Sequence, residues 1–147
     1  MSDLDLPGMY QSGDVSGIGG RIISSPQQYL VGWEKGSALE LPEAFSGADS
    51  IVLVGMGGSA MGGELVAGLA ETEAAIPIHV IRGYTLPGWV GSGTLVIVSS
   101  YSGDTEETLS AYHQARERGT HLLVVTSGGA LAKESTKNRT PLMRLDY

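Results

Sequence analysis

The chain has 147 residues and no cysteine, with 41% hydrophobic residues, 17% charged residues and a net charge of −7. This length and composition predict one folded domain with a proper core, and they exclude disulfides, thiolate metal sites and cysteine nucleophiles. The acidic charge argues against nucleic acid or an anionic membrane as the main partner, although backbone dipoles can still hold an anion locally. No run approaches the roughly 20 apolar residues of a membrane span. The acidic N-terminus has no signal-peptide core, so we expect a cytoplasmic protein.

The N-terminal part of the chain differs in pattern from the rest. Residues 1–20 are rich in glycine with little periodicity, which predicts an irregular arm. Ser25 and Pro26 are typical of an N-cap and a first helical position, so we expect a helix from there to about Gly36. We place one domain over residues 21–147.

From residue 51 onward, apolar runs alternate with glycine turns and helical patterns. The expected strands are 51–54, 76–81, 94–99, 122–126 and 142–145. The expected helices are 59–69, 105–119 and 130–137. The strands are apolar throughout, as in a parallel sheet covered on both faces. This alternation predicts right-handed βαβ crossovers and a doubly wound α/β fold.

A glycine-rich loop follows the first of these strands. Gly57 and Gly58 allow close approach of another group to the backbone, and Ser59 stands at the entrance of the next helix. Such a loop offers free N–H groups, a hydroxyl donor and the positive end of a helix dipole to an anion. The alternative is a tight strand-to-helix turn in which Ser59 is an ordinary N-cap.

The strand at 94–99 is followed by a loop rich in hydroxyl groups. Ser100, Ser102 and Thr105 supply three donors, and Gly103 leaves room for a compact anion. The alternative is a well-capped helix, in which Asp104 or Ser102 is the cap. Because Asp104 and the glutamates after it oppose a bound phosphate, some of these carboxylates must point away if the loop binds one.

A third loop, with Thr126 and Ser127, follows the next strand, and Arg82 and Tyr84 follow the strand at 76–81. Ligands of a doubly wound sheet bind at the carboxyl ends of the strands, where the strand order reverses. The three loops therefore predict one pocket for a phosphorylated small molecule, with Arg82, Tyr84, Thr126 and Ser127 as candidates for its rim. The alternative for Arg82 and Tyr84 is an ordinary exposed loop.

The three histidines give no sign of a catalytic or metal site. His79 lies within an expected strand, His113 on an expected helix and His121 at the opposite edge of the sheet from the pocket. None stands at metal-ligand spacing from another histidine or acid, so we expect structural roles, no bound metal and no cofactor.

Three of these segments resemble the sugar isomerase (SIS) domain, and more narrowly the bifunctional phosphoglucose/phosphomannose isomerases. They are IVLVGMGGSAMGGE from residue 51, SSYSGDTEETL from residue 99 and VVTSGGALA from residue 124. Residues 5–10 are a weaker match to the opening segment of the family. The resemblance covers about residues 20–147.

The resemblance implies a three-layer sandwich around a five-stranded parallel sheet. It implies that Ser100, Ser102 and Thr105 hold the phosphate of the sugar and that Gly57, Gly58 and Ser59 contact the substrate. The family interconverts glucose or mannose 6-phosphate and fructose 6-phosphate without a metal, through a glutamate base and a histidine. It commonly has Asn where this chain has Asp104.

Family members carry two SIS domains, and their catalytic glutamate, histidine and arginine match no position of this chain. The resemblance therefore implies the phosphosugar-binding N-terminal half of an isomerase, with no catalytic residue and little or no activity alone. Its partner is expected to be a second copy or the second SIS domain.

Two alternatives stay open. The first is a non-catalytic module that senses phosphosugars with the same pocket. The second is an NADP-binding Rossmann domain, because Gly55, Gly57 and Ala60 fit a permissive dinucleotide fingerprint. In that case Arg82 could serve the 2′-phosphate, but the serine-rich loop would have no role.

Overall fold

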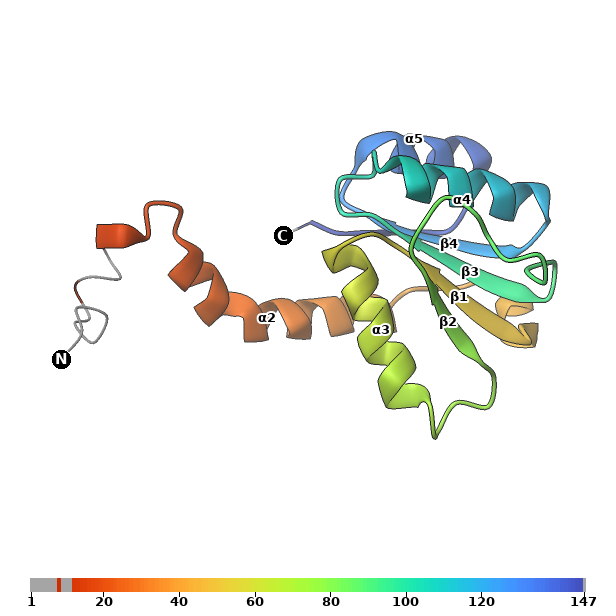
Figure 1. Ribbon diagram of the computed structural model, residues 1–147, viewed down its shortest axis with the longest axis horizontal. Coiled ribbons are helices and arrows are strands. Elements are labelled where there is room, and N and C mark those ends of the chain that lie inside the picture. The colour runs from red at the N-terminus through yellow and green to blue at the C-terminus, as the bar shows by residue number, and fades with distance from the viewer. Residues whose placement is uncertain (1–7, 9–11, 147) are drawn as a thin grey trace. The chain divides into compact units, whose positions relative to one another are not determined.

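The structure is a computed structural model that describes residue 8 and residues 12–146. The chain divides into two compact units, Met1–Leu39 with Tyr147, and Glu40–Asp146. Helix α2 (Ile18–Ser37) belongs to the first unit, and the sheet with its helices belongs to the second (Figure 1).

Helix α2 begins at Ile18, so the prediction of a start at Pro26 was wrong. The physical reason is a cap that lies further upstream. The carboxylate of Asp14 accepts hydrogen bonds from the N–H groups of Ile18 (2.7 Å) and Gly19 (2.6 Å), and Pro26 lies inside the helix. The predicted irregular arm over residues 1–20 falls partly on residues 1–7 and 9–11, which lie outside the described residues.

Five parallel strands form one sheet in the order β2-β1-β3-β4-β5 (Figure 1). They are β1 (Ser50–Val54), β2 (Ile78–Ile81), β3 (Thr94–Ser99), β4 (His121–Thr126) and β5 (Leu142–Arg144). The predicted α/β fold with a five-stranded parallel sheet is confirmed. The strand order reverses between β1 and β3, so the loops after these two strands flank the switch point at which such sheets bind ligands.

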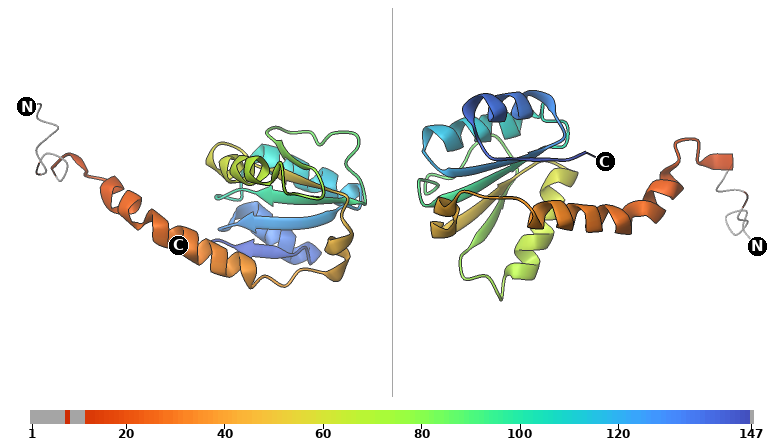
Figure 2. Two further views of the ribbon diagram at one scale, coloured as in Figure 1. Left: turned by 90° about the horizontal axis from the view of Figure 1, so that it is seen from below. Right: turned by 180° about the vertical axis from the view of Figure 1, so that it is seen from behind.

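The second unit also contains a 3₁₀ helix, η2 (Glu43–Gly47), and helices α3 (Gly58–Ala70), α4 (Glu106–Glu117) and α5 (Gly129–Asn138). Helix α3 packs on β1 and β2, whereas α4 and α5 cover β3, β4 and β5 from the other face (Figure 2). The crossover from β2 to β3 is a loop, and its Leu86 and Val90 are buried in the same core as Val96 and Val98. This core lies on the α4 and α5 face.

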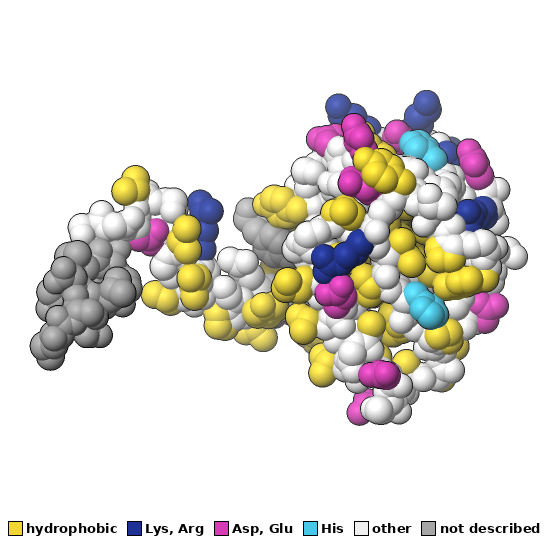
Figure 3. All heavy atoms as spheres, in the orientation of Figure 1, with side chains coloured by type: hydrophobic (Ala, Val, Ile, Leu, Met, Phe, Trp, Pro, Cys, Tyr) yellow, Lys and Arg dark blue, Asp and Glu magenta, His cyan; other side chains and the backbone are white. Residues whose placement is uncertain are grey.

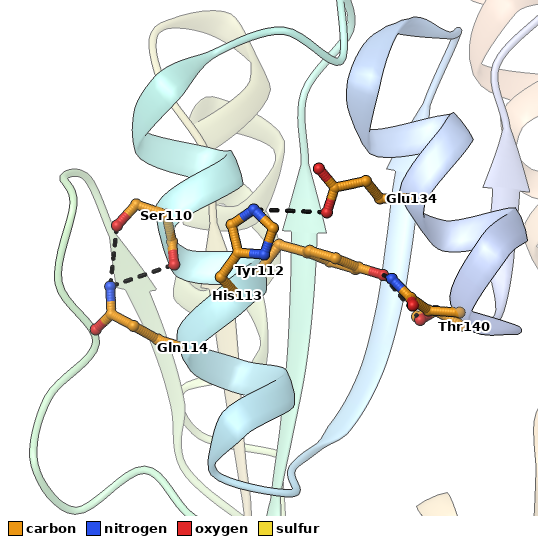
Figure 4. Close-up of polar contacts among 7 residues, drawn as sticks. Ser110, Tyr112, His113, Gln114, Glu134 and Thr140 are labelled. Carbon is orange, nitrogen blue, oxygen red and sulfur yellow. Dashed lines mark hydrogen bonds and ion pairs between the residues drawn. The ribbon is translucent and has the colours of Figure 1, made fainter.

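Polar contacts link α4 to α5 above this core (Figure 4). Tyr112 is fully buried, and its hydroxyl lies 3.2 Å from Thr140 Oγ1 and accepts from Asn138 Nδ2 at 3.1 Å. On the outer surface His113 Nε2 lies 3.5 Å from Glu134 Oε2. Helices α4 and α5 are therefore joined into one layer that packs on β3, β4 and β5.

The opposite face of the sheet is less well covered than the continuous apolar strands predict. Within Glu40–Asp146, α3 lies only on β1 and β2, and Ile97 of β3 and Val125 of β4 stay half-buried. Helix α3 itself buries only Ala60. Its Met61, Leu65 and Leu69 are 57%, 62% and 78% exposed, and hydrophobic side chains lie at the surface over this helix (Figure 3).

Candidate functional site

The three predicted loops meet at the carboxyl edge of the sheet, and the backbone of Tyr101 joins them. Its N–H donates to Ser59 Oγ at 3.4 Å. Its carbonyl accepts from the N–H of Ser127 at 3.1 Å and from Ser127 Oγ at 2.6 Å. Sequence reasoning did not single out Tyr101, because backbone groups of any residue type can make these bonds.

The loop of residues 99–105 is arranged around the hydroxyl of Ser100. Ser100 is only 2% exposed, and its Oγ accepts from the N–H of Gly103 at 3.1 Å and lies 3.0 Å from Thr105 Oγ1. Ser102 is exposed and Thr105 is half-buried. The structure thus brings the three predicted hydroxyls together, two of them open to solvent and Ser100 beneath them.

The N-terminus of α4 is open toward this loop. Its N-cap is Thr105, which makes no side-chain cap hydrogen bond, so the alternative in which Asp104 or Ser102 caps this helix is not what the structure shows. Ser102 Oγ instead accepts from the N–H of Asp104 at 3.3 Å. The first turn of a helix carries N–H groups that have no partner within the helix, and these groups attract anions. An anion beside Ser102 and Thr105 would therefore find both hydroxyl and backbone donors.

The acidic residues of this loop point to other partners. Asp104 Oδ1 accepts from the N–H of Ala130, at the start of α5, at 2.8 Å, which explains why Asp104 does not cap α4. Glu106 Oε2 accepts from Tyr84 Oη at 3.2 Å. The negative charge of Glu107, burial and the hydrogen bond to Glu106 raise the pKa of the Tyr84 phenol. Asp104 is thus turned toward α5, whereas Glu106 bonds to the predicted rim residue Tyr84 and Glu107 lies in the first turn of α4.

The loop after β1 lies on the other side of the switch point. Gly57, with a φ of +53°, is the N-cap of α3. The alternative for this loop, in which Ser59 is the N-cap, is therefore wrong. Gly57 and Gly58 are exposed and Ser59 is half-buried. Because Ser59 Oγ accepts from Tyr101, its own proton remains available to a ligand.

A cavity of about 180 Å³ opens beside Ser59 and includes Ser99 and Val125 in its lining. A larger cavity of about 490 Å³ lies at the opposite end of α3, between Ala67 and Ile78. Its lining has no hydroxyl and no cation, only the carboxylate of Glu71. The smaller cavity is itself lined mainly by apolar side chains, with only the hydroxyls of Ser59 and Ser99 among them. The grouped hydroxyls of Ser100, Ser102 and Thr105 lie outside both cavities.

The four predicted rim residues are held by the protein itself. Arg82 Nη2 lies 2.8 Å from Glu64 Oε1 on α3, and Tyr84 bonds to Glu106. Thr126 is buried, and its Oγ1 donates to the carbonyl of Gly128 at 3.1 Å. Ser127 donates to the carbonyl of Tyr101. Thr126 and Ser127 thus shape the third loop.

The three histidines lie away from these loops. His79 lies 5.0 Å from Trp89 and His121 lies 5.3 Å from Phe45, between ring centroids. Among residues 8 and 12–146, no group of three or more acidic or histidine side chains could hold a metal ion. In the same part of the chain, no helix has both the length and the apolar content to cross a membrane.

The SIS domain model matches residues 44–140, so the chain belongs to the SIS domain family. Over 117 residues it is 40% identical to a bifunctional phosphoglucose/phosphomannose isomerase from Caldicellulosiruptor bescii, covering 80% of this chain and 34% of that protein. It is 35% identical over 99 residues to a D-glucosamine-6-phosphate 4-epimerase from Sulfolobus acidocaldarius, covering 67% of this chain and 31% of that protein. This chain thus spans about a third of the length of both relatives.

The fold also matches solved structures. Tagatose-6-phosphate ketose/aldose isomerase from Escherichia coli superposes with a TM-score of 0.57 at 20% identity, over 67% of this chain and 30% of that one. At this level of identity the match supports the fold alone.

Proposed function

We propose that this chain is the phosphosugar-binding part of an aldose–ketose isomerase that acts on glucose or mannose 6-phosphate and fructose 6-phosphate. The observation that carries the proposal is the open N-terminus of α4, with the hydroxyls of Ser102 and Thr105 beside it and Ser59 across the switch point. A relative at 40% identity bears the name of such an isomerase.

The proposed binding mode follows from exposure and hydrogen bonding. Ser102, Thr105 and the first N–H groups of α4 hold the phosphate, and Ser100 supports them from below. Gly57, Gly58 and Ser59 contact the sugar, because Gly57 and Gly58 are exposed and the Ser59 hydroxyl, which accepts from Tyr101, can still donate its own proton. Arg82, Tyr84 and Ser127 form the rim, and Thr126, which is buried, shapes the third loop beneath it instead of lining the rim as predicted.

We assign no catalytic residue within this chain. Moving a proton between C1 and C2 requires a general base within hydrogen-bond reach of the sugar. Of the carboxylates near the loops, Asp104 bonds to the N–H of Ala130, Glu106 to Tyr84 and Glu64 to Arg82, and Glu107 lies half-buried in the first turn of α4. We therefore propose that the chain binds sugar phosphate with little or no isomerisation by itself.

Calorimetric titration of the 147-residue chain with glucose 6-phosphate and with fructose 6-phosphate tests this function. Loss of a hydroxyl that donates to a charged phosphate weakens binding roughly tenfold or more, which is the result expected for Ser102→Ala and Thr105→Val. Ser46→Ala is a matched control, because its hydroxyl bonds only to the carbonyl of Glu43. Equal binding of glucose without phosphate, or fast isomerisation of fructose 6-phosphate by this chain, would contradict the proposal.

The same titration with NADPH addresses the dinucleotide alternative. Family membership disfavours it, and the side chain that would serve a 2′-phosphate, Arg82, is paired with Glu64. A phosphosugar sensor would bind the same ligands. An isomerase assay on the complete gene product separates a sensor from an enzyme.

We also propose that the apolar face of α3 packs against another SIS domain, from a second copy or from a longer chain. A helix that is apolar all round is normally buried, whereas Met61, Leu65 and Leu69 are exposed. Light scattering decides between the two sources, since a dimer of this chain identifies the second copy. The proposed location is the cytoplasm, with which the absence of cysteine agrees, and cell fractionation would test it.

A further inference from the structure

Two loops of the site are joined more tightly than the sequence suggested. Gly103 and Gly129 both have positive φ, at +75° and +69°, and an added Cβ on Gly103 would overlap Gly128, while one on Gly129 would overlap Ser102. The N–H of Leu131 donates to the carbonyl of Gly103 at 2.9 Å. The loop of residues 99–105, the second of the three loops, therefore packs directly on the N-terminus of α5.

Asp104 completes this junction from the opposite direction. Its Oδ1 accepts from the N–H of Ala130 at 2.8 Å. Ala130 and Leu131 are in the first turn of α5, so two N–H groups that would otherwise attract an anion are already used by the second loop. The carboxylate charge also lies at the positive end of the α5 dipole, where it is stabilised.

The two neighbouring helix termini consequently differ. The start of α5 is closed by Asp104 and Gly103, whereas the start of α4 has no side-chain cap. A phosphate placed beside Ser102 and Thr105 therefore meets the α4 terminus alone. The carboxylate that stands in the middle of this loop is hydrogen bonded to the start of α5.

We propose that Asp104 is a positioning residue for the phosphate loop. By bonding to Ala130 it holds the turn of residues 102–105 so that the donors of Ser102, Thr105 and α4 converge, and it keeps α5 closed to the ligand. This inference rests on the proposed function. It explains how an acidic residue can stand within a phosphate-binding loop.

The inference and simple electrostatic repulsion predict opposite effects of substitution. If Asp104 positions the loop, Asp104→Ala loses a helix cap and binds glucose 6-phosphate roughly fivefold to tenfold more weakly. Asp104→Asn keeps an oxygen acceptor and binds within about twofold of the original chain. If Asp104 merely repels the phosphate, both variants bind more tightly than the original chain.

The experiment is calorimetry with glucose 6-phosphate on the 147-residue chain and three variants, together with amide hydrogen exchange of Ala130. Glu117→Ala is the matched control, because it removes the same charge from an exposed position in the last turn of α4. We expect weaker binding and faster Ala130 exchange in Asp104→Ala only. Unchanged or tighter binding by Asp104→Ala overturns the inference.

Failure of the proposed function has a different signature. If the original chain does not bind glucose 6-phosphate, the proposed function and the ligand-positioning role fall together. If the original chain binds and Asp104→Ala exchanges Ala130 faster without losing affinity, only the positioning role falls. If Ala130 exchange does not change in Asp104→Ala, the junction itself is refuted.

Discussion

Replacing Gly103 by alanine tests the junction between the second and third loops most directly. Gly103 has a φ of +75°, and a Cβ at this position would overlap the backbone of Gly128 and lie 2.8 Å from Thr126 Oγ1. The residue is buried and its carbonyl and N–H are both hydrogen bonded. The added methyl group therefore has no space unless one loop moves away from the other.

Gly119 provides the reference for this substitution. It has a φ of +65°, close to that of Gly103, but a Cβ there would have no atom within 4 Å. Gly119→Ala therefore carries only the cost of a left-handed backbone, about 1–2 kcal/mol. Gly103→Ala carries this cost plus about 1–3 kcal/mol for overlap with backbone atoms, so we expect a loss of about 2–5 kcal/mol.

Urea unfolding measures both losses. Trp89 fluorescence in a Trp33→Phe background reports on the second unit alone, because Trp33 lies on α2 in the first unit. We expect the midpoint to fall much further for Gly103→Ala than for Gly119→Ala at similar slopes. Equal losses in the two variants would refute the tight seating of the second loop on the third.

Three further predictions concern single positions. Arg139 follows α5 with a φ of +55°, in the place that Gly119 takes after α4. Arg139→Gly should therefore raise the free energy of unfolding by roughly 0.5–1 kcal/mol, measured by urea titration, and a decrease would contradict this. The pKa of Tyr84 lies above 10.0 because of Glu107 first, then burial and Glu106. Its stability contribution is therefore present below pH 10.0 and lost as the pH rises through the folded pKa, and an NMR titration in which Glu107→Gln leaves that pKa unchanged would disprove the cause. Hydrogen bonds from Gly19 and Ile18 lower the pKa of Asp14 below 3.8, so the start of α2 should be stable above that pH and fray as the pH falls through the folded pKa. Helicity measured by circular dichroism should also drop in Asp14→Ala, and no drop would count against the cap.

The sheet was predictable from the sequence because its signals are strong and local. Apolar runs such as 94–99, bounded by glycine and serine turns, define the strands, and β3 spans the predicted residues. The start of α2 was not predictable from Ser25 and Pro26. The carboxylate of Asp14 caps the helix from three residues before the N-cap, Gly17, and accepts from an N–H group at the start of the helix, which a side chain at the N-cap would otherwise do.

The site was predictable as a set of loops, but not in how the loops bond to each other. Sequence spacing brings Ser59, Ser102 and Ser127 to one edge of the sheet. It could not show that Asp104 caps α5 instead of α4, because the partner of Asp104 depends on how closely Gly103 approaches Gly129 in the loop after the neighbouring strand. Contacts between residues far apart in the sequence carry no local pattern.

The uneven burial of the helices has a consequence for ligand affinity. Ser59 lies on α3, which buries only Ala60, whereas the second loop leads into α4, whose Thr108, Ala111, Tyr112 and Ala115 are buried. A sugar phosphate that touches both loops must restrain a weakly anchored helix, and this ordering costs conformational entropy. A protein surface that covers α3 would already restrain this helix before the ligand binds, so that less conformational entropy would be lost on binding. If a ligand binds at Ser59 as proposed, its affinity and the contacts made on α3 are thermodynamically coupled, each strengthening the other, without any shared atom.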